Sequence, residues 1–326
     1  MLFKSLLLAG TASATCLSGL SKFKRAEGEE GVVQVGQFGY TGLIGPLNWA
    51  SIAPENEECK SGTTQSPINV VDGVIPISAD KPTIDIPQQA VEFENLGTTV
   101  ELVINGTTKI ADQDLVIKQA HFHFPGEHLV NGEYYPAEMH IVHEARTDPN
   151  TIAVISVLFQ MSADAASNPL LTGLQPHLQA IANPGTKTAI EGGLDFAGLV
   201  QHVQDSPLYQ YSGSLTTPPC AGGVTFLIAQ NPMDMPVDIY NAMKAIVGFN
   251  ARYTQADLDM GVNLIEVATK AGTAEQFPAP AGTGNGTEPT PTVEAVAGAP
   301  PAVTKGQTIV LSEISGQPTS VLAIIV

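Results

Sequence analysis

The stretch "QAHFHFPGEH", residues 119–128, holds three of the seven histidines of the chain within eight residues. Residues i and i+2 point to the same side of a β-strand, whereas on a helix they point to nearly opposite sides. The flanking residues are typical of a strand, so His121 and His123 are expected to share one face.

A second stretch, "AEMHIVHEA" at residues 137–145, places Glu138 and His140 on one face by the same rule. If the two stretches pair as neighbouring strands, about 4.8 Å apart, three imidazoles can converge on one point. Three neutral nitrogens with an open fourth position are what a catalytic zinc ion requires. The sequence therefore predicts a zinc site formed by His121, His123 and His140.

Less specific interpretations of these residues exist. A lone His-x-His pair is commonly an accident of a core or a surface, and Glu127 and Glu138 could be ordinary exposed charges. The third histidine at matching parity favours the metal site, and the H-E-x-x-H signature of zinc proteases is absent. The other four histidines are expected to take no part in the metal site. His128 and His143 are expected to be structural, and His177 and His202 to be exposed to solvent.

The rest of the chain predicts a mostly β (α+β) fold, a single domain built around a large, mainly antiparallel twisted sheet with peripheral helices. The apolar run at 151–161 is typical of a central strand buried on both faces. Helices are expected at 168–183, opening after Asn168, and at 236–250. Further short β-rich runs, cut by Gly, Pro and Asn, lie at 98–106, 115–124, 137–145 and 224–231.

Charge and length limit the function. The chain has 326 residues, of which 43% are hydrophobic, so a sizeable core can form. Its net charge of −18 would repel phosphate backbones, which argues against a nucleic-acid partner. The length fits one large domain or two modest ones, and we assign residues 26–270 to one catalytic domain.

The N-terminus indicates secretion. Residues 1–25 open with "MLFKSLLLAGTASATCLSG", which is typical of a signal peptide, with a possible short pro-segment at "KFKR"; a buried N-terminal helix is the alternative. Cys16 lies at the edge of this segment, which leaves Cys59 and Cys220. An oxidising compartment would pair them, whereas two free buried thiols are the alternative. We therefore expect a secreted protein, extracellular or associated with a cell wall.

Composition changes after the predicted domain. Of the 32 residues from 271 to 302, 24 are Ala, Gly, Pro or Thr, so 271–304 is expected to be a flexible linker, followed by a tail of unknown role at 305–326. The apolar end of the tail is too short for a lipid-anchor signal, and no membrane span is predicted. "NGT" occurs at Asn105 and Asn285, which makes both candidates for N-glycosylation.

Four motifs occur together in the order and spacing of one family. They are "SPINV" at 66–70, "QAHFHF" at 119–124, "AEMHIVHEA" at 137–145 and "YSGSLTTPPC" at 211–220. On these motifs the chain resembles an α-class carbonic anhydrase across about residues 36–268. The cysteines beside the first and last motifs are similar to the pair that secreted members of this family bridge.

The resemblance implies a zinc enzyme that hydrates carbon dioxide reversibly to bicarbonate and a proton, by attack of zinc-bound hydroxide. In carbonic anhydrases the zinc ion lowers the pKa of its bound water to about 7. Weak esterase activity could accompany the hydration, since the same nucleophile would serve both. The implied partner is the small-molecule substrate, carbon dioxide or bicarbonate, and the resemblance leaves the oligomeric state open.

The resemblance also implies roles for individual residues. His121, His123 and His140 match the Zn²⁺ ligands, and Gln119, Glu138 and the carbonyl of Asn250 match the groups that hydrogen-bond to those rings. Thr216 matches the hydroxyl that connects the zinc-bound hydroxide to a buried carboxylate, here Glu127. Thr217 matches a residue at the mouth of the site. The residues that match the apolar wall against which carbon dioxide rests are Val142, Val154, Leu215 and Phe226.

Three positions are notable within the family pattern. Fast members carry a histidine that passes the proton to buffer, and Thr98 takes its place in "FENLGTTVEL". Because threonine cannot accept a proton near pH 7 as an imidazole can, we expect slow regeneration of the hydroxide. Tyr40 matches a tyrosine that orders water in the site. Phe124 stands where the family usually has tryptophan, with a small change in packing expected.

An inactive binding or adhesion module with the same fold is the alternative function. Inactive relatives typically lose a metal histidine, and all three are present here together with Gln119, Glu127 and Thr216. This difference favours the enzyme.

Overall fold

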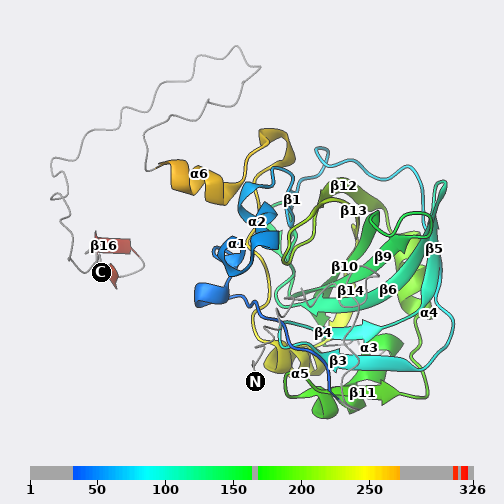
Figure 1. Cartoon of the computed structure of the whole chain (residues 1–326). Coiled ribbons are helices and arrows are strands. Elements are labelled where there is room, and N and C mark those ends of the chain that lie inside the picture. Colours follow the sequence, from blue (N-terminus) through cyan, green and yellow to red (C-terminus); the bar gives the residue numbers. More distant parts are fainter. Residues whose placement is uncertain (1–31, 164–167, 272–310, 315–316, 322–326) are drawn as a thin grey trace, which may run out of the picture. The chain divides into compact units, whose positions relative to one another are not determined.

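The structure is a computed structural model of the whole chain, and it describes residues 32–163, 168–271, 311–314 and 317–321. A large sheet dominates it (Figure 1), with the strand order β11-β3-β4-β6-β9-β10-β13-β12. β5 pairs with β6 and β2, and β14 pairs with β10. In this sheet only the pairings of β10 with β13 and β14 are parallel among the described strands, so the predicted mainly antiparallel sheet is confirmed.

The strand bounds are as follows. The sheet consists of β2 (Thr83–Asp85), β3 (Val91–Asn95), β4 (Val100–Val103), β5 (Gly106–Ile110), β6 (Gln113–His123), β9 (Ala137–Ala145), β10 (Ile152–Ser162), β11 (Lys187–Ile190), β12 (Leu208–Ser214), β13 (Gly222–Ala229) and β14 (Met233–Pro236). A small separate sheet contains β1 (Asn69–Val70), β7 (Leu129–Val130) and β8 (Glu133–Tyr134).

The centre of the sheet is buried on both faces. All nine residues of β9 are buried, and β10 is buried from residue 153 to 159, which confirms the central strand predicted at 151–161. Alternation sends Met139 and Ile141 into the main hydrophobic core and Val142 into a second apolar cluster on the other face. Polar side chains at this depth need partners, which makes the histidines of β6 and β9 conspicuous.

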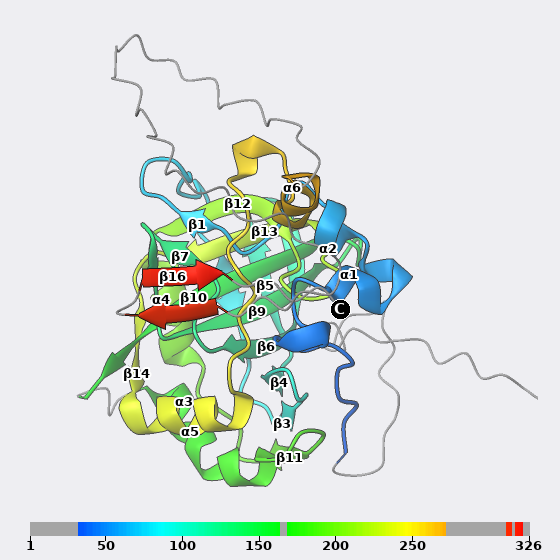
Figure 2. The ribbon, with the colours of Figure 1, turned by 90° about the vertical axis from the view of Figure 1, so that its left-hand side faces the viewer.

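The helices lie around the sheet (Figures 1 and 2). The α-helices are α1 (Trp49–Ile52), α2 (Glu58–Ser61), α3 (Pro169–Leu174), α4 (Ala197–Asp205), α5 (Val237–Val247) and α6 (Leu264–Ala271). The 3₁₀ helices are η2 (Gly42–Ile44), η3 (Pro54–Asn56), η4 (Gln175–Ile181) and η5 (Leu258–Met260).

Both predicted helices exist, with one difference. Asn168 caps α3 by accepting a hydrogen bond from the backbone N–H of Leu171 at 3.3 Å. The helix expected to run to residue 183 changes to 3₁₀ geometry as η4, because Pro176 has no N–H to continue the α-helical ladder. The second helix is α5, which ends at Val247, and Gly248 follows it with a φ of 75°.

A disulfide joins Cys59 of α2 to Cys220, which precedes β13, with Cα atoms 5.0 Å apart. The predicted bridge is therefore confirmed, and the alternative of two free thiols is wrong. Both cysteines are fully buried beside Phe38 and Trp49. The bridge fastens α2 to the end of the loop that carries Thr216 and Thr217.

The chain divides into two compact units, Met1–Pro278 and Ala279–Val326. In the second unit, β15 (Leu311–Ile314) and β16 (Gln317–Val321) pair antiparallel. The predicted signal segment, most of the linker and Asn285 lie outside the described residues, so the domain boundaries stay predictions. Within the described ranges, none of the helices combines the length and the apolar character that a membrane crossing needs.

Candidate metal centre

The three predicted ligands come together on β6 and β9. His121 lies directly opposite His140, and His123 lies opposite Glu138, in the antiparallel register of these strands. The ring centroids of His121, His123 and His140 are 4.6–5.2 Å apart, and one nitrogen from each ring lies within 4.8 Å of the others. All three side chains are buried.

The second nitrogen of each ring is already engaged. Nδ1 of His121 is 2.8 Å from Oε1 of Gln119, and Nδ1 of His123 is 2.8 Å from the carbonyl of Asn250. Nε2 of His140 is 2.7 Å from Oε1 of Glu138. Each acceptor requires an N–H, so each neutral ring turns the lone pair of its other nitrogen to the shared point.

Electrostatics keeps these rings neutral. Burial lowers the pKa of His123 to about 4 and that of His121 well below its ordinary value, and the neighbouring imidazoles add to the effect at His121. Burial also lowers the pKa of His140, although the nearby carboxylate of Glu138 opposes this. Neutral imidazole is the form that binds a metal ion.

A metal ion fits this donor set. Nε2 of His123 is a buried nitrogen without a hydrogen-bond partner among the described residues. A buried lone pair that is left unsatisfied costs free energy, and a cation would relieve that cost. Three imidazole nitrogens are typical of a catalytic zinc site rather than a structural one.

A second group of possible ligands, His128, Glu138 and His140, does not offer the same chemistry. Nδ1 of His128 is 2.6 Å from Oε1 of Glu138, and its Nε2 is 2.6 Å from the hydroxyl of Tyr211. Both ring nitrogens are therefore engaged, which leaves no lone pair for an ion. His128 is structural, as predicted.

Glu138 connects the two groups. One oxygen, Oε1, accepts from His128, His140 and Ser156, while Oε2 accepts from the backbone N–H groups of Glu127 and His128. Burial would raise its pKa, yet these histidines hold the pKa well below its usual value. An ionised carboxylate at this point fixes both rings.

Thr216 and Glu127 lie together beside the histidines. Burial raises the pKa of Glu127 to about 7, while the nearby His140, the backbone N–H of Arg252 and the Thr216 hydroxyl lower it in part. Oε1 of Glu127 accepts from the N–H of Arg252 at 2.8 Å, and it lies 3.4 Å from Nδ1 of His123. Oε2 makes no hydrogen bond of ordinary geometry with any described residue, Thr216 included.

An apolar wall stands next to the histidines. Val142, Val154 and Phe226 face one another in register across β9, β10 and β13, and the ring of Phe226 lies 5.8 Å from that of His140. Leu215 belongs to the same buried cluster. Thr217 is also buried, in the loop that follows β12.

Residues 44–263 match the family described as eukaryotic-type carbonic anhydrase. The chain belongs to this carbonic anhydrase family. It is 31% identical over 203 residues to the carbonic anhydrase of Klebsiella pneumoniae, a match covering 60% of this chain and 77% of the relative. The fungal α carbonic anhydrase of Aspergillus oryzae is similar in structure, with a TM-score of 0.68, 37% identity, and coverage of 72% of this chain and 99% of that one.

A further similar structure is the α-carbonic anhydrase of Thermovibrio ammonificans in complex with the inhibitor sulfanilamide. The TM-score is 0.60 and the identity 31%, with coverage of 68% of this chain and 95% of that one. Family, relatives and structural neighbours agree with the predicted resemblance, fold and enzyme class. Carbonic anhydrases act on carbon dioxide and bicarbonate, so the substrate is a small molecule.

Thr98, the carbonic anhydrase proton-shuttle position in our sequence prediction, lies in the turn before β4 and is buried. Its carbonyl accepts from Nδ2 of Asn250 at 3.0 Å, which ties this turn to the residue that holds His123. The ring of Tyr40 packs against Phe38 and Trp49. Its predicted role in ordering water in the site stays a prediction.

Sequence reasoning missed two glutamates on the metal-site face of this carbonic anhydrase. Residues directly opposite on paired strands share a face, so the register places Glu94, Glu101, His121, His140 and Ser156 in one row across five strands. Both glutamates are fully buried. The alternation in "VEFEN" at 91–95 indicated that the two glutamates of this stretch share one face of a strand. Which residues lie beside them depends on how neighbouring strands pair, and the sequence of one strand does not give that register.

His143 faces away from the histidine trio, as predicted, and its Nε2 is 2.9 Å from the hydroxyl of Thr108. Burial lowers its pKa to about 4, against about 6.5 when unfolded. The unfolded chain thus binds more protons than the folded chain between these pH values. The contribution of His143 to the free energy of unfolding is therefore fully present above pH 6.5 and is lost as the pH falls toward 4. We expect this residue to contribute up to about 3 kcal/mol to that loss.

The test is urea unfolding of the wild type and of His143→Leu at pH 7 and pH 5. The wild type should lose more stability between the two pH values than the variant does, because only the wild type has this buried imidazole. Equal losses in the two proteins would contradict the assignment.

Proposed function

We propose that the protein catalyses the reversible hydration of carbon dioxide to bicarbonate and a proton, with Zn²⁺ held by His121, His123 and His140. The single observation that carries the proposal is the convergence of three buried ring nitrogens, each with its other nitrogen fixed by an acceptor. When bound, zinc supplies carbonic anhydrases with a water whose pKa is about 7.

Residues of this chain would prepare the substrate and the nucleophile. The buried side chains of Val142, Val154, Leu215 and Phe226 provide an apolar surface for carbon dioxide and exclude bulk water from it. The Thr216 hydroxyl, next to the carboxylate of Glu127, would accept a hydrogen bond from the nucleophile and donate a hydrogen bond to Glu127. That polarity would leave a lone pair of the nucleophile directed at the substrate.

A stopped-flow assay of carbon dioxide hydration, run with a zinc determination on the same sample, tests this function. We expect about one zinc ion per chain and hydration that a chelator removes and added zinc restores. Hydrolysis of activated esters, in the same preparation, should be weaker. Stoichiometric zinc without hydration would instead support the inactive binding module.

Proton release is expected to limit turnover because Thr98 stands at the shuttle position. Imidazole buffers should therefore raise the rate, and Thr98→His should be faster than the wild type in dilute buffer by about tenfold or more. The measurement is the hydration rate against imidazole concentration, with Thr98→Gln as the size-matched control that cannot titrate. A wild-type rate that is already high and insensitive to buffer would overturn the idea.

We further propose that the protein is secreted, with residues 1–25 removed, 271–304 acting as a flexible linker, and Asn105 glycosylated. The Cys59–Cys220 disulfide supports an oxidising compartment. Asn105 is exposed between β4 and β5, where a glycan has room. N-terminal sequencing and glycosidase treatment of protein from culture medium test these assignments, and an intact residue 1 would contradict the signal segment.

A further inference from the structure

A buried chain of hydrogen bonds connects β12 to the metal centre. The hydroxyl of Tyr211 lies 2.6 Å from Nε2 of His128, and Nδ1 of the same ring lies 2.6 Å from Oε1 of Glu138. This oxygen of Glu138 also lies 2.7 Å from Nε2 of His140. All four side chains are buried, although two strands separate β12 from β9 in the sheet. Tyr211 is thus connected to a predicted metal ligand through His128 and Glu138.

The chain continues on the other side of Tyr211 and ends at a backbone donor. The hydroxyl of Ser66 lies 2.8 Å from that of Tyr211, and it accepts a hydrogen bond from the N–H of Ser214 at 3.0 Å. Both serines are fully buried. A Cβ atom at Gly213 would collide with Oγ of Ser66 and would lie 2.6 Å from a ring carbon of Tyr211. The close approach of these two hydroxyls to β12 therefore requires glycine at this position.

The geometry determines which atom donates at each step. The N–H of Ser214 can only donate, so the Ser66 hydroxyl is the acceptor in that hydrogen bond. The other partner of this hydroxyl among the described residues is Tyr211, so Ser66 donates to Tyr211. Tyr211 then donates to Nε2 of His128, which leaves the N–H of this neutral ring at Nδ1, facing Glu138. All of these hydrogen bonds run in one direction, from β12 to Glu138.

The contacts of Glu138 agree with this direction. Its Oε2 faces the backbone N–H groups of Glu127 and His128, and its Oε1 faces the rings of His128 and His140. A carboxylate offers only acceptors to these groups, so Nδ1 of His128 must be the donor. Burial raises the pKa of Tyr211 well above its ordinary value, so its hydroxyl keeps the proton that it directs at His128.

We propose that Tyr211 is a positioning residue for the metal centre, because its hydroxyl fixes the tautomer of His128 and thereby holds Glu138 against His140. Without the hydroxyl, Nε2 of His128 is a buried acceptor without a donor, which is costly. The ring can relieve this cost by turning or by moving its proton to Nε2. Either change weakens its hydrogen bond to Glu138 and loosens the carboxylate that orients His140. The inference rests on the proposed zinc site, of which His140 is a ligand.

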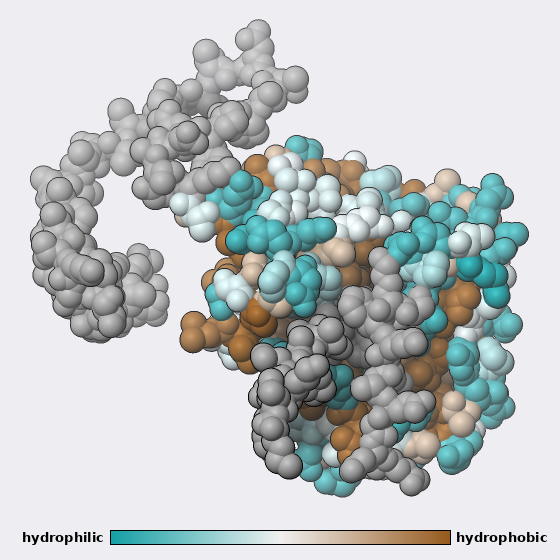
Figure 3. Space-filling view, in the orientation of Figure 1, coloured by the Kyte–Doolittle hydropathy of each residue, from teal (hydrophilic) through white to brown (hydrophobic). Residues whose placement is uncertain are grey.

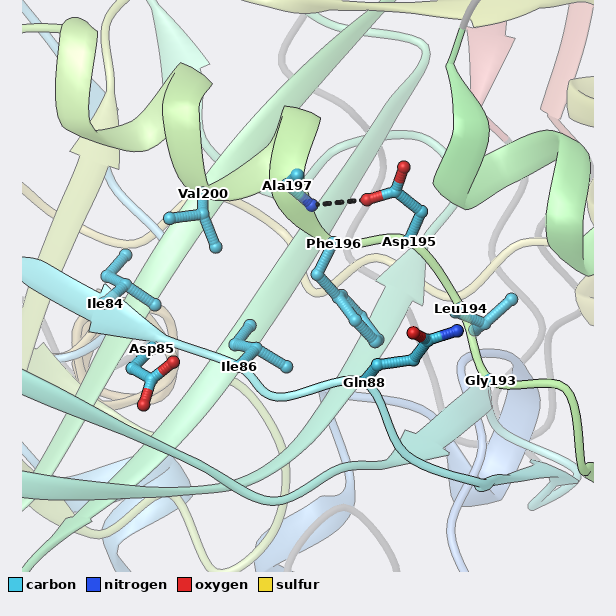
Figure 4. A pocket seen from close by; sticks show the side chains of 10 residues that line it. All are labelled: Ile84, Asp85, Ile86, Gln88, Gly193, Leu194, Asp195, Phe196, Ala197 and Val200. Atoms are coloured by element: carbon cyan, nitrogen blue, oxygen red, sulfur yellow. Dashed lines mark hydrogen bonds between the residues drawn. The ribbon is translucent and has the colours of Figure 1, made fainter.

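Burial makes the hydroxyl of Tyr211 hard to replace. Polar side chains at the surface, which are common on the face shown in Figure 3, can exchange a lost partner for water. The hollow between β2 and the start of α4 is an example (Figure 4). Asp195 accepts there from the N–H of Ala197 at 2.9 Å, but both Asp195 and Asp85 are exposed. Tyr211 and His128 are buried, so bulk water does not take the place of the hydroxyl.

The test compares the zinc affinities of Tyr211→Phe and Tyr209→Phe, measured on the full-length protein by competition with a chelator of known affinity. Tyr209 is the matched control, since it is also a buried tyrosine of β12, but its hydroxyl bonds to Asp72 and Gln230 instead of His128. We expect Tyr211→Phe to weaken zinc binding about tenfold and Tyr209→Phe to bind zinc as the wild type does. Equal weakening in both variants would contradict a specific role of Tyr211.

Nitrogen NMR of the histidine rings gives a second readout, which a purely structural role of Tyr211 would not move. In the wild type the proton of the His128 ring should be on Nδ1, and this single state should be lost in Tyr211→Phe but kept in Tyr209→Phe. The measurement does not require bound zinc. A wild-type ring with its proton on Nε2 would overturn the proposal.

Ser66→Ala decides the question if Tyr211→Phe fails to fold. This change removes the donor to Tyr211 but leaves Tyr211 able to donate to His128, so zinc binding should weaken less, by about threefold. Zinc affinity equal to that of the wild type in Tyr211→Phe, or in Ser66→Ala if only that variant folds, would overturn this inference alone. A wild type that binds no zinc would overturn the proposed function together with it.

Discussion

Replacing His140 with alanine is expected to remove stoichiometric zinc and to reduce carbon dioxide hydration by at least about a thousandfold, since the metal supplies the activated nucleophile. The ring of His140 is one of three nitrogen donors that converge within 4.8 Å, and it is held by Glu138 at 2.7 Å. Two remaining imidazoles cannot hold zinc in the geometry of a catalytic site. Zinc content by mass spectrometry and stopped-flow hydration are measured on the same sample.

Two comparisons make the His140 result specific. His177→Ala removes a histidine of η4 that lies outside the site, and it should retain both zinc and activity. Gln119→Ala keeps all three ligands but removes the acceptor that orients His121, so zinc affinity should fall by only about 10–100-fold. Full zinc occupancy and full activity in His140→Ala would exclude the proposed centre.

Removal of the Cys59–Cys220 disulfide should lower the free energy of unfolding by more than the loss of the His143 contribution does. The bridge spans a sequence separation of 161 residues. Closing a loop of that length lowers the conformational entropy of the unfolded chain, which stabilises the folded protein by up to about 5 kcal/mol. Because the two sulfurs are buried beside Phe38 and Trp49, alanine in their place adds a small packing loss. Urea unfolding of the Cys59→Ala/Cys220→Ala double variant measures the effect.

A reduced sample of the wild type provides the matched control, because reduction breaks the disulfide without replacing any residue. The reduced protein and the double variant should unfold at similar, lower urea concentrations than the oxidised protein. Unfolding midpoints that do not move on reduction would show that the bridge contributes little to stability.

The alternation of side chains along a strand was sufficient to predict which histidines share the face of the metal site. His121 and His123 share a face because side chains alternate along a strand, and this holds wherever the strand is placed. The same rule placed His143 on the other face. The buried run at 151–161 and the helix after Asn168 were also predicted, because burial and capping are properties of short segments.

The resemblance to carbonic anhydrases supplied the distant partners. Asn250 lies 127 residues from His123 in the chain, so no local period connects them. Their contact is formed by the packing of the segment that follows α5 against the end of β6. The break of the predicted helix into α3 and η4 was missed, although Pro176 marked the place.

The sequence by itself determined the ligand types and their parity on two strands, because these depend on residue chemistry and on a two-residue period. That Cys59 and Cys220 form a bridge, rather than two free thiols, was decided by the structure. Only the tertiary structure decided that Glu138 serves His128 and His140 together, that Glu94 and Glu101 extend the histidine row, and that the hydroxyl of Tyr211 meets His128. These features depend on strand register and on contacts between distant segments, which the packing of the whole domain fixes and no local pattern encodes.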